Sequence, residues 1–149
     1  MSEPAGAGPY PDGLPTGEVL VGVLRQALEE AAATPRGQRA VTGHDEHFEL
    51  EIDGGQLIHV AVQGGTLAVS SGASPRREPL HFTRVQLGEA TLRDILRGRI
   101  SPVEAMEQGK LFLRTRLYGG ALITILLRCA YDLARDRALV RDSSTNPAL

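Results

Sequence analysis

LRGRISPVEAMEQGKL, residues 96–111, is the stretch of sequence that decides the fold of this chain. Gly98 is suited to end a preceding helix, because glycine adopts the positive φ of a helix C-cap without strain. Ser101 is followed by proline and then by Glu104, a capping box that predicts the start of a second, short helix. Gly109 can end that helix. The stretch therefore predicts a helix, a turn and a short helix, with a strand to follow at residues 111–117.

Upstream of this stretch the sequence alternates between apolar and charged residues. In residues 48–53, Phe, Leu and Ile alternate with Glu, Glu and Asp, which is the period of a strand with one buried face. Glycine pairs at 54–55 and 64–65 mark tight turns. The pattern predicts an antiparallel meander with one face in water. Further strands are predicted at residues 57–62, 66–70 and 80–85.

Helices are predicted on both sides of the meander. Leu20, Leu24 and Leu28 lie on one face of an amphipathic helix, which Thr16 can cap and Pro35 can end. The final helix is predicted at residues 119–135, and its first three turns are apolar on nearly every side. Such a helix must be covered on most sides. One sheet face covers only one side, so another helix, a partner chain or a bound ligand must cover the rest.

Length and composition predict one domain with two loose ends. Of the 149 residues, 1–15 are expected to be a flexible leader, 16–140 the domain and 141–149 a frayed tail. The net charge of −2 gives no reason to expect nucleic acid binding. The longest apolar stretch is too short to span a bilayer. One cysteine, no signal-peptide pattern and arginine in place of lysine favour a cytoplasmic, bacterial protein.

The spacing of Gly98, Pro102, Ala105, Gly109 and Lys110 resembles the signature of the sterol carrier protein type two family. The preceding order of a leading helix and a glycine-punctuated meander is also similar. The resemblance implies an α/β (α+β) fold with a mostly antiparallel sheet of about five strands, covered by helices. It also implies an apolar tunnel between sheet and helices that takes sterols, fatty acyl chains or similar molecules.

Apolar side chains of the second half are expected to form the wall of this tunnel. Arg114 and Arg116 are candidates for anchoring an anionic head group at its mouth. The other arginines of this half are interpreted as a solvated surface. The wall residues are expected to be Phe82, Leu92, Ile95, Leu96, Met106, Tyr118, Leu122, Ile123, Leu126 and Leu127.

Few residues suggest catalysis or metal binding. His59 and His81 are candidate acid–base groups if the pocket belongs to an enzyme and a carboxylate lies nearby, although an exposed or core histidine is favoured. Residues 44–47, with a histidine at each end, are interpreted as a solvated turn, because a metal site needs three or four convergent ligands. Cys129 is interpreted as a small buried residue. No metal or cofactor is expected.

Three functions remain open, because a fold alone does not select one. A carrier or binding module for an apolar small molecule is favoured, with a sterol, fatty acyl or polyketide-like ligand. An enzyme in the same pocket, a cyclase or isomerase of bacterial secondary metabolism, is the alternative. A protein-interaction module, including a homodimer, is the third.

Overall fold

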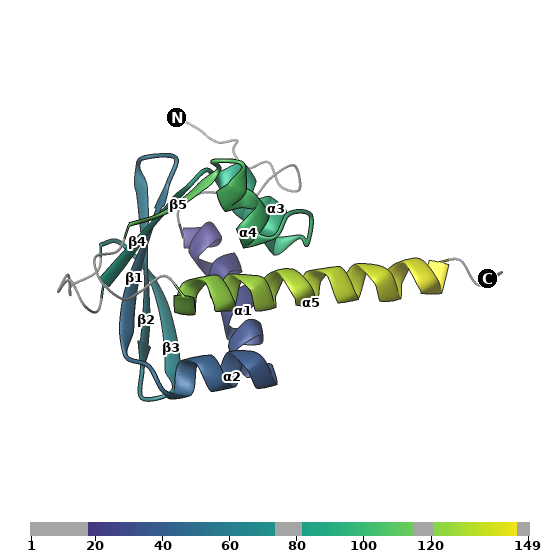
Figure 1. The fold of residues 1–149 in the computed structure, drawn as a ribbon, viewed down its shortest axis with the longest axis horizontal. Coiled ribbons are helices and arrows are strands. Elements are labelled where there is room, and N and C mark those ends of the chain that lie inside the picture. Colours follow the sequence, from purple (N-terminus) through teal and green to yellow (C-terminus); the bar gives the residue numbers. More distant parts are fainter. Residues whose placement is uncertain (1–17, 74–81, 115–120, 146–149) are drawn as a thin grey trace.

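The computed structural model describes residues 18–73, 82–114 and 121–145, which form a five-stranded sheet with the helices gathered on one side of it (Figure 1). The strands are β1 (Glu46–Ile52), β2 (Gln56–Gln63), β3 (Thr66–Ser71), β4 (Phe82–Leu87) and β5 (Leu111–Arg114). The helices are α1 (Glu18–Ala33), α2 (Pro35–Thr42), α3 (Glu89–Leu96), α4 (Pro102–Glu107) and α5 (Ala121–Thr145).

The strand order of the sheet is β3-β2-β1-β4-β5. The pairs β1–β2, β2–β3 and β4–β5 are antiparallel, whereas β1 and β4 run parallel. The turn after β1 places Asp53 and Gly54 at positive φ, and the turn after β2 does the same with Gly64 and Gly65. Both turns are of the kind that matches the twist of a hairpin. The predicted α/β fold, with a mostly antiparallel sheet of five strands, is confirmed.

One face of the sheet and the apolar face of α1 enclose the core. Leu20, Leu24 and Leu28 of α1 are fully buried, as the helical spacing predicted. Phe48 and Leu50 of β1 meet them from the sheet. Edge strand β3 is also tied to α1, because the Arg25 guanidinium donates two hydrogen bonds to the Val69 carbonyl oxygen, at 3.2 and 2.9 Å. The contact gives a hydrogen-bond donor to a backbone carbonyl of β3, which as an edge strand has a neighbouring strand on one side only.

Helix α5 lies among the other helices and then leaves the body of the molecule (Figure 1). It contacts α1, α2, α3 and α4. Its second half projects, with Leu139 59% and Val140 67% exposed. The helix continues to Thr145, ten residues beyond the predicted end and into the predicted tail, since no glycine or proline interrupts residues 136–145. No helix of the described ranges is long and apolar enough to cross a membrane.

The sequence interpretation missed α2. Pro35 was expected only to end the first helix, but it also occupies the first turn of the second one. The Thr34 side chain caps this helix by accepting the Gly37 N–H at 3.0 Å. Gly37 lies so close to α1 that an added Cβ would meet the Ala31 carbonyl oxygen at 1.9 Å. Two helices joined this tightly leave no loop, and so no composition change, to mark the boundary.

Candidate functional site

The structure brings most of the predicted tunnel wall into one buried apolar cluster. Leu92 and Ile95 of α3 contribute to the cluster and are fully buried. Leu96 and Met106 pack against it while partly exposed. Tyr118 and the side chain of Phe82 lie outside the described residues. Helix α5 supplies the remaining wall residues, all of them at most 2% exposed: Leu122, Ile123, Leu126 and Leu127.

One polar side chain enters this apolar wall from the sheet. Thr83 of β4 lies beside Phe48 of β1 in register, so the two side chains share the core face. Thr83 is 1% exposed, and its hydroxyl oxygen has no hydrogen-bond partner among the residues that the structure describes. A buried hydroxyl in this state costs about 1–3 kcal/mol. The sequence interpretation missed it, because a threonine in an alternating strand carries no signal of its own.

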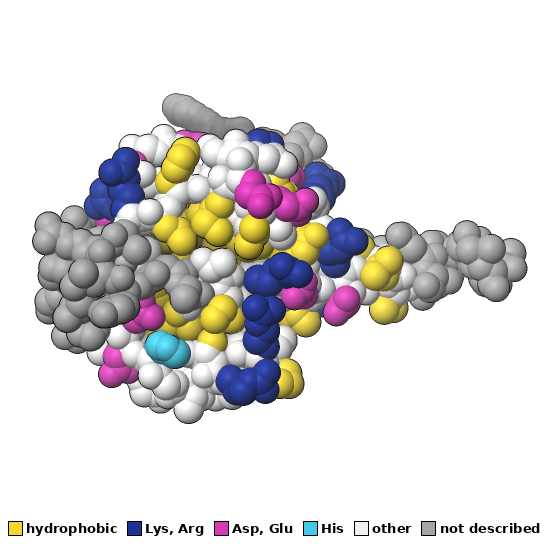
Figure 2. All heavy atoms as spheres, in the orientation of Figure 1, with side chains coloured by type: hydrophobic (Ala, Val, Ile, Leu, Met, Phe, Trp, Pro, Cys, Tyr) yellow, Lys and Arg dark blue, Asp and Glu magenta, His cyan; other side chains and the backbone are white. Residues whose placement is uncertain are grey.

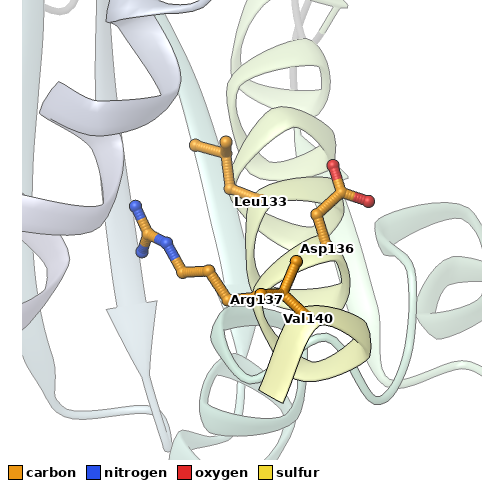
Figure 3. A pocket seen from close by; sticks show the side chains of 4 residues that line it. All are labelled: Leu133, Asp136, Arg137 and Val140. Carbon is orange, nitrogen blue, oxygen red and sulfur yellow. The ribbon is translucent and has the colours of Figure 1, made fainter. Parts of the chain in front are cut away.

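Two cavities lined by described residues lie around the second half of α5. One, of about 630 Å³, is lined by residues of the α3–α4 connection and of α5. A second, of about 320 Å³, is lined by Leu133, Asp136, Arg137 and Val140 (Figure 3). In Figure 3 the Arg137 side chain points from α5 toward α1. The tunnel itself is not among these cavities and stays a prediction.

A row of charged residues crosses the opposite face of the sheet. Strand register places His59 of β2 across from Glu49 of β1, Glu49 beside Arg84 of β4, and Arg84 across from Arg114 of β5. Glu49 is fully buried and pairs with the Arg84 guanidinium. A second Arg84 nitrogen lies 3.3 Å from a carboxylate oxygen of Glu51. The face predicted to be wet therefore contains a buried charge at its centre.

The two histidines of this face are in contact. His47 Nδ1 and His59 Nε2 are 2.8 Å apart, and the rings stack with their centroids 5.1 Å apart. Burial lowers the pKa of His59 below 6.5; nearby His47 lowers it further, and Glu49 opposes both effects. The low pKa keeps His59 a neutral acceptor or base at neutral pH.

This row does not meet the predicted tunnel wall. His59 lies on the sheet face away from the helices, since its register partner Glu49 alternates with core residues Phe48 and Leu50. Arg114 is exposed on that same outer face, where its Nε donates to Gln86 Oε1 at 2.6 Å. The other candidates, His81 and Arg116, lie outside the described residues.

Residues 44–47 only partly match the predicted solvated turn. His44 is exposed, and its Nδ1 lies 2.6 Å from the Ala40 carbonyl oxygen. His47 is instead a buried residue of β1, because the strand begins at Glu46 and the neighbouring strand supplies a stacking partner. In the ranges that the structure describes, no three His, Cys, Asp or Glu side chains are placed to hold a metal ion. Cys129 is buried, as predicted.

Comparison with solved structures identifies this architecture. Sterol carrier proteins match the chain with TM-scores of 0.50 to 0.55. The UbiJ-SCP2 ubiquinone synthesis protein matches at a TM-score of 0.55 and 14% identity, over 82% of this chain and 96% of its own. Palmitated SCP2L2 from Aedes aegypti matches at 0.51 and 19% identity, over 73% of this chain and 91% of its own.

A part of a larger enzyme is also similar. A double mutant of the sec-alkyl sulfatase PisA1 matches at a TM-score of 0.50 and 20% identity over 64% of this chain, which spans only 16% of the length of that enzyme. No protein-family model and no curated protein matches the sequence. At identities of 14 to 20% the similar structures establish the fold alone. The chain therefore has the sterol carrier protein fold that the spacing of residues 98–110 predicted.

Proposed function

We propose that this protein binds one apolar small molecule between the sheet and helices α3, α4 and α5, and that it serves as a carrier or binding module. The ligand class is a sterol, a fatty acyl chain or a polyketide-like molecule. The observation that carries the proposal is the buried hydroxyl of Thr83 within an apolar wall, for which the described part of the chain offers no hydrogen-bond partner. Binding sites for apolar molecules combine such walls with a few polar anchors.

The Thr83 hydroxyl gives the ligand a defined orientation. A carboxyl or hydroxyl group at the end of an apolar ligand would complete the missing hydrogen bond and remove its cost. The tail would then lie along α5, whose Leu126 and Leu127 are adjacent in sequence and therefore point in different directions. Both are buried. A protein of the same fold, SCP2L2 from Aedes aegypti, is palmitated, which supports an acyl chain as the ligand.

Titration with cis-parinaric acid, a fluorescent fatty acid, tests this proposal. Binding is expected to saturate near one molecule per chain, as one pocket implies. In Thr83→Val the side chain keeps its shape and loses the hydroxyl, so the fold is expected to survive while affinity falls about tenfold, the equivalent of one hydrogen bond. Thr66→Val is the matched control, because Thr66 is exposed and its hydroxyl donates to Gln63. Absence of saturable binding refutes the function, and unchanged affinity in Thr83→Val refutes the anchor.

A charge on the α5 wall provides a second test. Leu127→Asp places a carboxylate where the wild-type side chain is 1% exposed. If a ligand site adjoins Leu127, the protein stays folded and binding of the fatty acid is lost. If Leu127 is packed on all sides, the variant unfolds, because an unpaired charge is buried. Leu139→Asp is the control on the projecting part of the same helix, and both its stability and its binding are expected to match the wild type.

An enzyme of the cyclase or isomerase class is the second candidate function. The contact between His47 and the neutral His59, beside Glu49, is the observation that favours it. A substrate would bind on the outer face of the sheet in that case. Once a substrate is identified, His59→Ala is expected to abolish turnover and keep binding of the fatty acid. Full activity in that variant would refute the acid–base role.

The predicted interaction module and homodimer depend on a different feature. The projecting part of α5 exposes Leu139 and Val140, which are apolar side chains that a second copy could cover. Sedimentation of the wild type and of Leu139→Asp measures this directly. A concentration-dependent dimer that the substitution abolishes supports the interaction module, and a monomer at all concentrations refutes the homodimer.

The cytoplasmic location stays a prediction.

A further inference from the structure

A cleft of about 630 Å³ lies where α5 leaves the body of the molecule. One wall is the connection between α3 and α4, and the other is the second half of α5. It differs from the proposed apolar site, with which it shares only Leu96. The described residues that line it are Leu96, Arg97, Gly98, Arg99, Ala134, Arg137 and Ala138.

The connection is pressed against α5 and held by its own backbone. Gly98 has a φ of +75°, and a Cβ added there would lie 2.8 Å from the backbone nitrogen of Arg135. The Arg97 N–H donates to the Arg93 carbonyl at 3.0 Å, and the Arg99 N–H donates to the Asp94 carbonyl at 2.8 Å. Arg97 and Arg99 therefore project from a fixed backbone on either side of a glycine that no other residue could replace without strain.

Three arginines line the cleft, and the described residues that line it include no acidic side chain. Arg99 pairs at its edge with Asp94 at 3.7 Å, and Arg137 pairs with Glu30 of α1 at 2.8 Å. These pairs are exposed and therefore weak. Arg97 is exposed and has no ion pair within the part of the chain that the structure describes. Figure 2 shows Lys and Arg side chains near the place where α5 leaves the body.

We propose that this cleft binds a phosphate group carried by a molecule with an apolar portion. A guanidinium donates two parallel hydrogen bonds to phosphate oxygens, and three arginines from two elements line this cleft. Beside them the floor is apolar, formed by Leu96, Ala134 and Ala138. The two alanines lie one helical turn apart on the same face of α5, and their small side chains leave space above that face. The phosphate belongs to a soluble ester or to a lipid headgroup. This proposal does not depend on the apolar ligand proposed above.

Calorimetric titration with inorganic pyrophosphate and flotation with lipid vesicles test the proposal and distinguish the two sources. Saturable binding of pyrophosphate supports a soluble phosphate ester. Binding to phosphatidylcholine vesicles only when they contain phosphatidic acid, without pyrophosphate binding, supports a lipid headgroup. In either case Arg97→Gln is expected to weaken binding about tenfold, since it removes one charged contact.

Two further variants separate a site from general surface charge. Arg128→Gln removes the same charge from α5, but Arg128 pairs with Asp132 outside the cleft, so binding is expected to be unchanged. Ala138→Leu keeps every charge and fills the apolar strip, and it is expected to weaken binding as strongly as Arg97→Gln. Both positions are exposed or half-exposed, so thermal melts are expected to match the wild type. Absence of binding to both probes, or equal losses in Arg97→Gln and Arg128→Gln, overturns the proposal.

Discussion

Glu49 and Arg84 form an ion pair whose two ends differ sharply in their access to water. The Glu49 side chain is 0% exposed, whereas that of Arg84 is 29% exposed. Arg84 also contacts Glu51 at 3.3 Å. When Glu49 is removed, Arg84 keeps Glu51 and solvent. When Arg84 is removed, Glu49 stays buried. The pair is therefore asymmetric in what each partner loses.

Removal of Arg84 is expected to destabilise the protein more than removal of the Glu49 charge. Arg84→Met leaves a buried carboxylate without this cation and is expected to cost about 3–5 kcal/mol. Glu49→Gln is expected to cost about 1–3 kcal/mol, the range for a disturbed buried hydrogen bond. The double variant is expected to recover part of the Arg84→Met loss. Urea denaturation of all three variants measures this, and equal costs for the two single variants would contradict the asymmetry.

The stability of the protein is expected to fall as the pH drops below 6.5. Burial and His47 lower the pKa of His59 in the folded state, so the unfolded chain binds a proton there more readily. The contribution of His59 to stability is complete above 6.5, the pKa in the unfolded chain. It is lost as the pH falls from 6.5 through the lowered pKa of the folded state. His59→Gln is expected to flatten this dependence, and exposed His44→Gln to leave it intact. Thermal melts from pH 5 to 8 compare them; identical slopes in all three proteins would rule out His59 as the source.

Gly98→Ala is expected to destabilise the protein more than Gly109→Ala. Both glycines have positive φ, +75° and +71°, so both variants carry the same backbone strain, about 1–2 kcal/mol. Only at Gly98 would the added Cβ meet another element, 2.8 Å from the Arg135 nitrogen, whereas Gly109 faces open space. The difference between the two melting temperatures measures the close approach of the connection to α5. If the two variants melt together, that approach has no energetic role.

Ser101→Ala is expected to cost about 1 kcal/mol, the usual value of a helix N-cap. The Ser101 hydroxyl accepts the Glu104 N–H at 3.1 Å, and the Ser101 N–H donates to the Glu104 carboxylate at 2.9 Å. The Ser101 backbone, and then its side chain, lower the pKa of Glu104 below 4.5. The contribution of the ionised Glu104 carboxylate to stability is lost as the pH falls through its lowered pKa. An NMR titration of Ser101→Ala is expected to show a higher pKa for Glu104 than in the wild type, because the hydroxyl is lost while the backbone N–H stays. An unchanged pKa would show that the Ser101 hydroxyl does not act on this carboxyl.

The predictable parts of the fold are those that short segments encode. The capping box at Ser101 and the hairpin turn at Asp53 depend on neighbours within three residues, and both were predicted. The place of β4 beside β1 was not predictable, because the alternating pattern within a strand does not show which other strand it pairs with. For the same reason Glu49 was expected on a wet face: its partner comes from a strand whose position the spacing does not reveal.

In the candidate site, too, the features that short segments encode could be predicted, and those that depend on distant segments could not. The burial of the apolar residues of α3 and α5 could be predicted, since helical spacing alone aligns them. The state of the Thr83 hydroxyl could not be predicted, since only the packed core shows that it has no partner among the described residues. Arg97 and Arg99 lie in the stretch that decides the fold, yet their cleft needs Arg137, which lies beyond the predicted end of α5.

The parallel pairing of β1 with β4 sets the order in which the sheet can close during folding. His47 and His59 are 12 residues apart, whereas Glu49 and Arg84 are 35 apart. Closing a longer loop costs more chain entropy and is slower, so the β1–β3 meander can form first. We therefore expect the Glu49 carboxylate to lose its water late in folding, when β4 brings Arg84 to it.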